Sequence, residues 1–324
     1  MARPFLRAAL AALLAAASAC AMAQSFDLQG HRGTRGHRPE NTLPAFEHAL
    51  RIGVTTLEMD AAITSDGVVL ISHDPVLNPD FVRGADGQWL ATPVAIKTLT
   101  FEQSQRYDVG RLKPGTAYAR QFSLQQPIDG TRLPTLASVF DMVKRVGADH
   151  VQFDIETKMD LQHPENTLPP EAFVETLLKV IRDAGMEDRV MIQSFDWRTL
   201  QVLRQVAPRM RTVYLTTQSP RFSNLDSPVW TAGFRLADHG SVPAMVKAAG
   251  GTTWSPNFQV LTRDGVRQGQ ALGLKVIPWT VNEERDIEKM LDLGVDGIIS
   301  DYPDRVRTAM QKRGMPLPPQ VKVP

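Results

Sequence analysis

The chain has 324 residues, with 36 Lys and Arg against 35 Asp and Glu and a formal net charge of +1. This balance excludes the strongly basic surface of a typical nucleic-acid-binding protein and the charge blocks of a disordered tail. A chain of this length can bury the core of one large domain, and its single cysteine cannot form an internal disulfide.

Residues 1–23 have the pattern of a secretory signal. Arg3 and Arg7 precede the apolar run 8–17, and an Ala-Met-Ala motif ends at Ala23. Because this run is too short to cross a bilayer of about 30 Å, we expect cleavage after Ala23 and a periplasmic or secreted protein without an integral membrane segment. Cleavage would leave 34 basic and 35 acidic residues, a net charge of −1.

A lipoprotein is the alternative for this segment. Cys20 follows the small residues Ser18 and Ala19, as a lipidated N-terminus would, but Ala17 makes the motif a weak one. We therefore favour cleavage after Ala23, which gives a mature chain without cysteine that relies on core burial for its stability.

Strand-like and helix-like segments alternate along the rest of the chain. The expected strands are 27–30, 55–63, 68–72, 150–155, 190–194, 211–215, 253–255, 275–279 and 297–300. The expected helices are 43–52, 136–146, 170–184, 197–206, 242–249, 264–272, 283–291 and 305–312. Such alternation predicts parallel strands with helical crossovers, and the length and the lack of a G-x-G-x-x-G turn favour an α/β (β/α)₈ TIM barrel. One of the nine strand candidates, 68–72 or 297–300, is then peripheral or wrong.

The alternation stops between residues 75 and 134, where Pro, Gly, Gln and Arg increase. A structureless loop of this length is unusual in a compact domain unless it is functional or folds as a small unit. We interpret it as an insertion after the second or third strand that covers the active face, with ordinary surface decoration as the alternative. The barrel domain would span 24–313, followed by a Pro-rich, extended tail at 314–324.

The stretch 30–42 follows the first expected strand and precedes the first expected helix. Its glycines permit a tight loop, and it brings together His31, Arg32, Glu40 and Asn41. An ordinary polar loop that ends in a helix cap is the alternative.

Carboxylates alternate along two expected strands. Glu58 and Asp60 share one face of the first, and Asp154, Glu156 and Lys158 share one face of the second. Buried carboxylates that point together require a cation. An ion pair between Glu156 and Lys158, without a metal, is the alternative to a metal site.

If a metal binds, the oxygen ligands Glu58, Asp60 and Glu156 suit one hard divalent cation, Ca²⁺ or Mg²⁺, rather than zinc. A cation near Arg32 and Lys158 favours an anionic ligand, and arginine matches phosphate in a bidentate manner. We therefore expect the chain to bind a small phosphate-containing molecule.

His31 and His73 both follow expected strands, at the end of a barrel where active sites lie. Two histidines on opposite sides of a phosphate can act as general base and general acid near neutral pH. For the remaining histidines we expect structural or surface roles. Motifs of serine hydrolases, zinc peptidases and P-loop enzymes are absent from the sequence.

Several motifs together resemble the glycerophosphodiester phosphodiesterase family, in its periplasmic type. They are His31-Arg32-Gly33, Pro39-Glu40-Asn41-Thr42, Glu58-x-Asp60, His73-Asp74, Glu156-x-Lys158, Trp279-Thr280-Val281-Asn282 and the run 296–303. The resemblance implies a TIM barrel with a small insertion after the second histidine. It also implies catalysis by His31 and His73, a metal held by Glu58, Asp60 and Glu156, and phosphate held by Arg32 and Lys158. Glu40, Asn41 and Trp279 would support the site.

The expected activity is the metal-dependent hydrolysis of glycerophosphodiesters to sn-glycerol 3-phosphate and an alcohol. One alternative is a phospholipase D-like cleavage of lysophospholipid or sphingomyelin. Another is a non-catalytic periplasmic protein that binds phosphodiesters, although binding alone does not require a paired acid and base. Asp154 stands where the family often has a neutral polar residue.

Overall fold

The computed structural model describes residues 26–219 and 222–323. The segment 1–23, with the expected signal and Cys20, lies outside the described residues.

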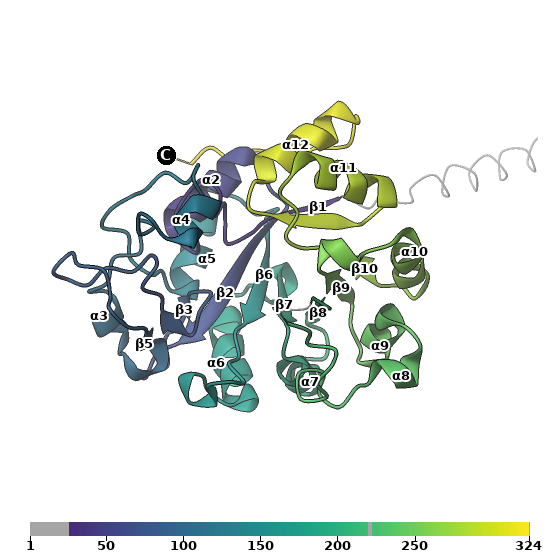
Figure 1. Ribbon diagram of the computed structural model, residues 1–324, viewed down its shortest axis with the longest axis horizontal. Coiled ribbons are helices and arrows are strands. Elements are labelled where there is room, and N and C mark those ends of the chain that lie inside the picture. Colours follow the sequence, from purple (N-terminus) through teal and green to yellow (C-terminus); the bar gives the residue numbers. More distant parts are fainter. Residues whose placement is uncertain (1–25, 220–221, 324) are drawn as a thin grey trace, which may run out of the picture.

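Eight parallel strands form the centre of the molecule (Figure 1). Along the sheet they are β10 (Lys275–Val276), β9 (Thr253–Pro256), β8 (Arg211–Thr216), β7 (Val190–Ser194), β6 (Gln152–Thr157), β2 (Thr56–Ile63), β1 (Asp27–Gly30) and β11 (Gly297–Ser300). Backbone hydrogen bonds from Asp296 N to Val276 O and from Ile299 N to Pro278 O connect the two outer strands. The predicted (β/α)₈ barrel is confirmed.

Helices surround the strands as an outer ring (Figure 1). They are α2 (Leu43–Ile52), α5 (Leu136–Arg145), α6 (Pro170–Asp183), α7 (Trp197–Val206), α8 (Leu236–His239), α9 (Val242–Ala248), α10 (Arg263–Ala271), α11 (Glu284–Leu293) and α12 (Pro303–Lys312). Their sequences account for the arrangement. In α5, for example, Leu136, Val139, Phe140 and Val143 form one buried stripe, and the Thr135 hydroxyl accepts a hydrogen bond from Ser138 N.

The ninth strand candidate, 68–72, is the peripheral one. Strand β3 (Val69–Ile71) pairs antiparallel with the end of β2 and does not join the barrel, whereas β11 completes it. Strand β10 (Lys275–Val276) is shorter than the predicted strand 275–279, because Pro278 has no N–H to donate to a neighbouring strand. The bonds from Ile277 N to Trp254 O and from Trp279 N to Pro256 O nevertheless continue the contact with β9.

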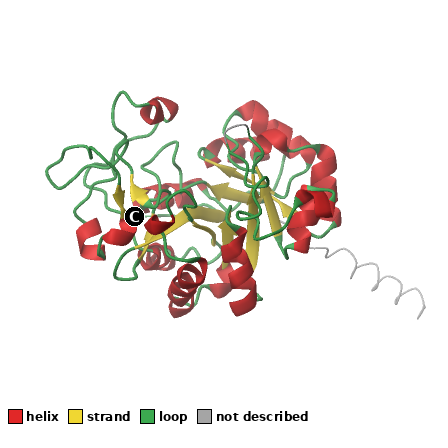
Figure 2. Cartoon of the chain, turned by 60° about the horizontal axis from the view of Figure 1, so that its bottom comes forward, coloured by secondary structure: helices red, strands yellow, loops and turns green. Residues whose placement is uncertain are grey.

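Residues 75–134 lie to one side of the barrel, mainly as loops (Figure 2). Short elements interrupt them: β4 (Val76–Leu77), β5 (Val94–Ala95), α3 (Phe101–Ser104) and α4 (Ala117–Gln121). The segment has its own small core, to which β2 and β3 also contribute; its buried members are Ala62, Leu70, Leu77, Phe81, Val82, Ile96, Val109 and Leu133. It is therefore a folded unit and not an open loop.

The final residues run along the outside of the barrel without regular structure. Val321 N donates to Leu50 O, and Arg307 donates to Pro318 O, so this tail lies against α2 and α12. In the part of the chain that the structure describes, no helix has the length and apolar character needed to cross a membrane.

Candidate active site

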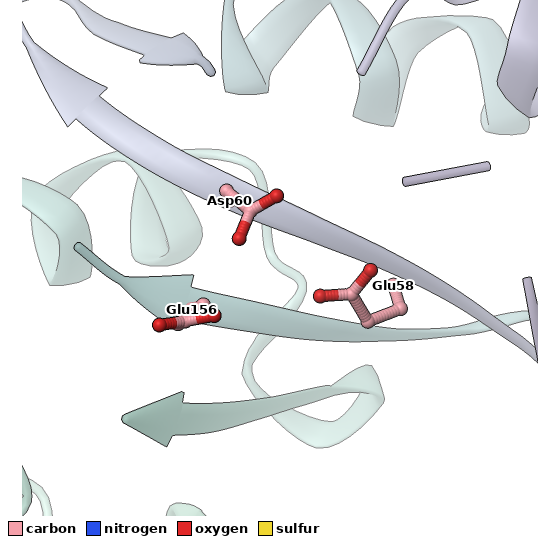
Figure 3. Close-up of side chains that lie close together, drawn as sticks. All are labelled: Glu58, Asp60 and Glu156. Carbon is pink, nitrogen blue, oxygen red and sulfur yellow. The ribbon is translucent and has the colours of Figure 1, made fainter. Parts of the chain in front are cut away.

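Three carboxylates gather inside the barrel on two neighbouring strands. Glu58 and Asp60 extend from β2 and Glu156 extends from β6, with Asp60 in register with Glu156 (Figure 3). All three side chains are buried, and one oxygen of each lies within 4.8 Å of those of the other two. The structure therefore brings together the three predicted metal ligands.

The charges of this cluster do not balance within the protein. Lys158 is the nearest base, with Nζ 2.9 Å from Glu156 Oε1 and 3.7 Å from Asp60 Oδ1. Three carboxylates against one ammonium leave about two negative charges, since Arg32 is shared with Glu40. Among the described residues, the buried Asp60 Oδ1 has no hydrogen-bond partner. A buried carboxylate oxygen without a hydrogen bond, in an oxygen-only donor set, fits a hard divalent cation.

The pKa values reflect the same crowding of charge. Burial, and then the charge of Asp60, raise the pKa of Glu58 well above its ordinary value. Burial likewise raises the pKa of Glu156 to about 7, although Lys158 opposes the shift. Burial would also raise the pKa of Asp60, but the charges of His73, Arg32 and Lys158 outweigh it and keep this pKa below the usual range. A bound cation would remove the cost of ionising all three.

Neighbouring groups fix two of the carboxylates from outside the cluster. Arg32 N donates to Glu58 Oε2 at 2.7 Å, and Gln193 Nε2 donates to Glu58 Oε1 at 2.7 Å. Asn41 Nδ2 donates to Asp60 Oδ2 at 2.8 Å. Asn41, for which the resemblance implies a supporting role, thus contacts Asp60, and Gln193 on β7 contacts Glu58.

Asp154 lies outside this cluster. It precedes Glu156 by two residues on β6 and is in register with Glu58 on β2. Its side chain is fully buried. Burial, followed by the charge of Asp27, raises its pKa well above the ordinary value. Among the described residues, neither of its carboxylate oxygens has a hydrogen-bond partner.

The loop between β1 and α2 carries the arginine of the site. Gly33 has a φ of 80°, and a Cβ there would lie 2.7 Å from the Ala45 carbonyl carbon. Only glycine lets this loop pack so closely against α2. Arg32 and Asn41 also have positive φ, of 49° and 56°. This backbone directs Arg32 Nη1 to Glu40 Oε1 at 2.7 Å and places Arg32 Nε 3.5 Å from Asp60 Oδ2.

His31 is held by a carboxylate that is distant in the sequence but follows the neighbouring strand β11. Its Nδ1 donates to Asp301 Oδ1 at 2.6 Å, and its Nε2 lies 3.9 Å from Glu58 Oε2. Burial, aided by Arg35, lowers the pKa of His31 to about 4, although Asp301 opposes the shift. The imidazole is therefore neutral at pH 7, with Nε2 able to accept a proton.

His73 has a similar but more open arrangement. Its Nδ1 lies 2.7 Å from Asp74 Oδ1, and Asn78 Nδ2 donates to Asp74 Oδ2 at 2.7 Å. The His73 side chain is 31% exposed, compared with 12% for His31. Burial, followed by the charges of Arg32 and Lys158, lowers its pKa well below the ordinary value.

Both histidines line one cavity of about 160 Å³. Its polar side consists of His31, Arg32, Arg35, Glu58, His73, Glu156 and Gln193. Its apolar side consists mainly of Phe195, Leu215, Trp279 and Ile299. The Trp279 Nε1–H donates to Ser255 O at 3.0 Å, and its ring centroid lies 5.2 Å from that of Phe195. Trp279 therefore forms part of the apolar wall.

The sequence analysis did not assign a role to three residues that hold the polar side in place, of which Arg35 and Gln193 line the cavity and Asp301 lies behind His31. Asp301 orients His31, Arg35 pairs with Asp301 through Nε at 2.7 Å, and Gln193 binds Glu58. Asp301 directly follows β11, and Gln193 is the last but one residue of β7. Polar residues at the carboxyl ends of barrel strands are the signal that could have identified these two.

Comparison with known proteins assigns the chain to a family. Residues 31–305 match the Glycerophosphoryl diester phosphodiesterase family. The chain belongs to this family. Membership confirms the resemblance expected from the motifs and the enzyme class, a phosphoric diester hydrolase that acts on glycerophosphodiesters.

Individual relatives agree with this assignment. A glycerophosphodiester phosphodiesterase of Caldanaerobacter subterraneus subsp. tengcongensis is 28% identical over 286 residues, which cover 88% of this chain and 97% of the relative. A crystal structure from Silicibacter pomeroyi DSS-3, named "Putative glycerophosphoryl diester phosphodiesterase", is 34% identical with a TM-score of 0.81. The match covers 91% of this chain and 96% of that one. Human lysophospholipase D GDPD1 is 25% identical over 283 residues, or 86% of this chain and 83% of the relative.

Proposed function

We propose that this family member uses His31 and His73 as its acid–base pair and binds one divalent cation, Ca²⁺ or Mg²⁺, through Glu58, Asp60 and Glu156. The observation that carries the proposal is that both imidazoles and two of these carboxylates, Glu58 and Glu156, line the same cavity. The products would be sn-glycerol 3-phosphate and an alcohol.

Arg32 and Lys158 bind the phosphate in this proposal. Both lie beside the carboxylate cluster, and Arg32 also lines the cavity. The bound cation would add positive charge beside the phosphoryl oxygens. The Arg32 side chain is buried and that of Lys158 is only 13% exposed. In such a water-poor site, fixed positive charges offset the charge that develops in the transition state more strongly than they would in water.

The histidines move the protons. One imidazole takes a proton from the attacking oxygen, and the other gives a proton to the leaving alkoxide. Because His31 is neutral and its Nδ1–H is donated to Asp301, only its Nε2 can exchange a proton with substrate. The hydrogen bond between His73 and Asp74 fixes the second imidazole in the same way.

The decisive experiment uses the full purified protein with glycerophosphocholine and Ca²⁺ or Mg²⁺. We expect release of glycerol 3-phosphate and choline at equal rates. Release of glycerol and phosphocholine would show cleavage of the other ester bond, and no release of either pair would refute the activity. A His31→Ala, His73→Ala double variant is the matched control for contaminating phosphodiesterases.

A phospholipase D-like activity on lysophospholipids is the second candidate, favoured by the apolar wall of Phe195, Leu215, Trp279 and Ile299. Lysophosphatidylcholine and glycerophosphocholine share the scissile bond and differ in the acyl chain. A higher kcat/KM for glycerophosphocholine would support the main proposal, and a higher value for lysophosphatidylcholine would support the second candidate.

We also propose that the protein is exported after cleavage behind Ala23, on the basis of the charge and hydropathy pattern of residues 1–23. Mass spectrometry of the processed chain should give Gln24 as the first residue. A lipid-modified Cys20 at the N-terminus would support the lipoprotein alternative instead.

A further inference from the structure

Helix α4, in the segment 75–134, contacts the loop that carries His31 and Arg32. Its Tyr118 hydroxyl donates to Glu40 Oε2 and accepts from Arg35 Nη1 at 3.4 Å. The next residue after the helix, Phe122, lies under the Arg35 guanidinium at 4.4 Å from the ring centroid. Two side chains from the insertion thus touch the polar side of the barrel mouth.

Glu40 connects Tyr118 to the site. Its Oε1 accepts from Arg32 Nη1 at 2.7 Å while its Oε2 accepts from Tyr118, and the Glu40 side chain is only 5% exposed. A carboxylate held by a donor on each oxygen has one orientation. The direction of the Arg32 guanidinium therefore depends on a residue 86 positions further along the chain.

We propose that Tyr118 is a positioning residue that fixes Arg32 for phosphate through Glu40, so that residues 75–134 form a part of the active site and not only surface decoration. The inference rests on the proposed role of Arg32 as a phosphate ligand. Tyr118 touches neither histidine nor any of the three carboxylates of the cluster by a hydrogen bond that we observe among the described residues.

The surroundings of Tyr118 suit this role. Its ring packs against Phe81 and Phe122, with centroid distances of 5.8 and 5.1 Å, so the side chain has a fixed place. Burial, and then the charge of Glu40, raise the pKa of Tyr118. The hydroxyl therefore stays protonated and donates to Glu40. Without that donor, one buried oxygen of Glu40 would lose its partner, and the carboxylate could rotate away from Arg32.

The test is Tyr118→Phe in the full chain, which removes one hydroxyl and keeps the ring. We expect kcat/KM for glycerophosphocholine to fall by about 10-fold or more, as for a hydrogen bond to a charged group, mainly through KM. The Kd for inorganic phosphate, measured by calorimetry, should rise in parallel. Tyr107→Phe is the matched control, because Tyr107 packs against the same small core, and it should leave both values unchanged.

A double-mutant cycle with Glu40→Gln tests the route of the effect. If Tyr118 acts through Glu40, the two substitutions together should cost little more than the larger one alone. Additive losses, or a Tyr118→Phe variant with wild-type kcat/KM and phosphate affinity, would overturn the inference. If the wild-type chain binds phosphate but releases no glycerol 3-phosphate, the proposed function fails, while the phosphate Kd values still decide the role of Tyr118.

Discussion

Asp301 Oδ1 lies 2.6 Å from His31 Nδ1, although the two residues are 270 positions apart in the sequence. The pair forms where the first and last barrel strands meet, because Gly30 in β1 is in register with Ser300 in β11. Barrel closure therefore places a carboxylate behind the histidine that faces the cavity. The same carboxylate accepts from Arg35 and Asn282, so its position is fixed from three sides.

Asp301→Asn should lower kcat strongly, although the variant keeps the His31 imidazole itself. The amide cannot stabilise an imidazolium by charge, and it no longer balances Arg35. We expect a loss of about 10- to 100-fold in kcat, a part of the roughly 10²–10⁴-fold that an acid–base side chain contributes. Asp304→Asn is the matched control, since Asp304 pairs with His37 at 2.8 Å outside the cavity. Wild-type kcat in Asp301→Asn would refute the positioning role of this carboxylate.

His31→Ala and His73→Ala should each lower kcat by about 10²–10⁴-fold with little change in the thermal midpoint, if each moves one proton. His163→Ala is the control, because the His163 side chain is 64% exposed and far along the chain from the proposed pair. Steady-state kinetics with glycerophosphocholine measures the effect. Near-normal turnover in both variants would exclude the two histidines from the mechanism.

Chelation should silence the enzyme reversibly. Removal of the cation leaves Glu58, Asp60 and Glu156 with only Lys158 and Arg32 to balance them. Activity should disappear in excess EDTA and return with Ca²⁺ or Mg²⁺. The thermal midpoint should rise with cation concentration, since about 100 Kd of a ligand stabilises by about 2.7 kcal/mol, and this rise should be much smaller in Glu58→Gln. Full activity in EDTA, with no metal in the purified protein, would favour the ion pair of Glu156 and Lys158 alone.

Gly33→Ala should destabilise the protein far more than Gly67→Ala. The two glycines have almost the same φ, 80° and 79°, but a Cβ at Gly33 meets the backbone of Ala45 while a Cβ at Gly67 meets nothing within 4 Å. We expect about 1 kcal/mol for the backbone strain at Gly67 and a larger loss at Gly33, together with weaker phosphate binding. Urea unfolding of both variants measures the difference. Equal losses would show that the contact with α2 carries no energy.

The sequence determined the architecture of this protein. Alternating apolar segments of strand and helix length admit few packings, and parallel strands with helical crossovers close into a barrel at this chain length. The same regularity located Glu58, Asp60 and Glu156, because residues two apart on a strand share a face. The sequence left open whether 68–72 or 297–300 is the peripheral strand, since a short apolar strand has the same sequence pattern in a barrel and in a hairpin.

Only the tertiary structure decided which distant groups hold the site in place. His31 is held by Asp301 and Glu58 by Gln193, in both cases through side chains from different strands or strand ends. Glu40 is held by Tyr118 from the insertion. Periodicity carries no information about such pairs, because hydrogen bonds form wherever closure of the barrel and packing of an irregular segment bring donor and acceptor together. The sequence thus gives the residues that could do the chemistry, and three-dimensional packing gives the orientation in which they can do it.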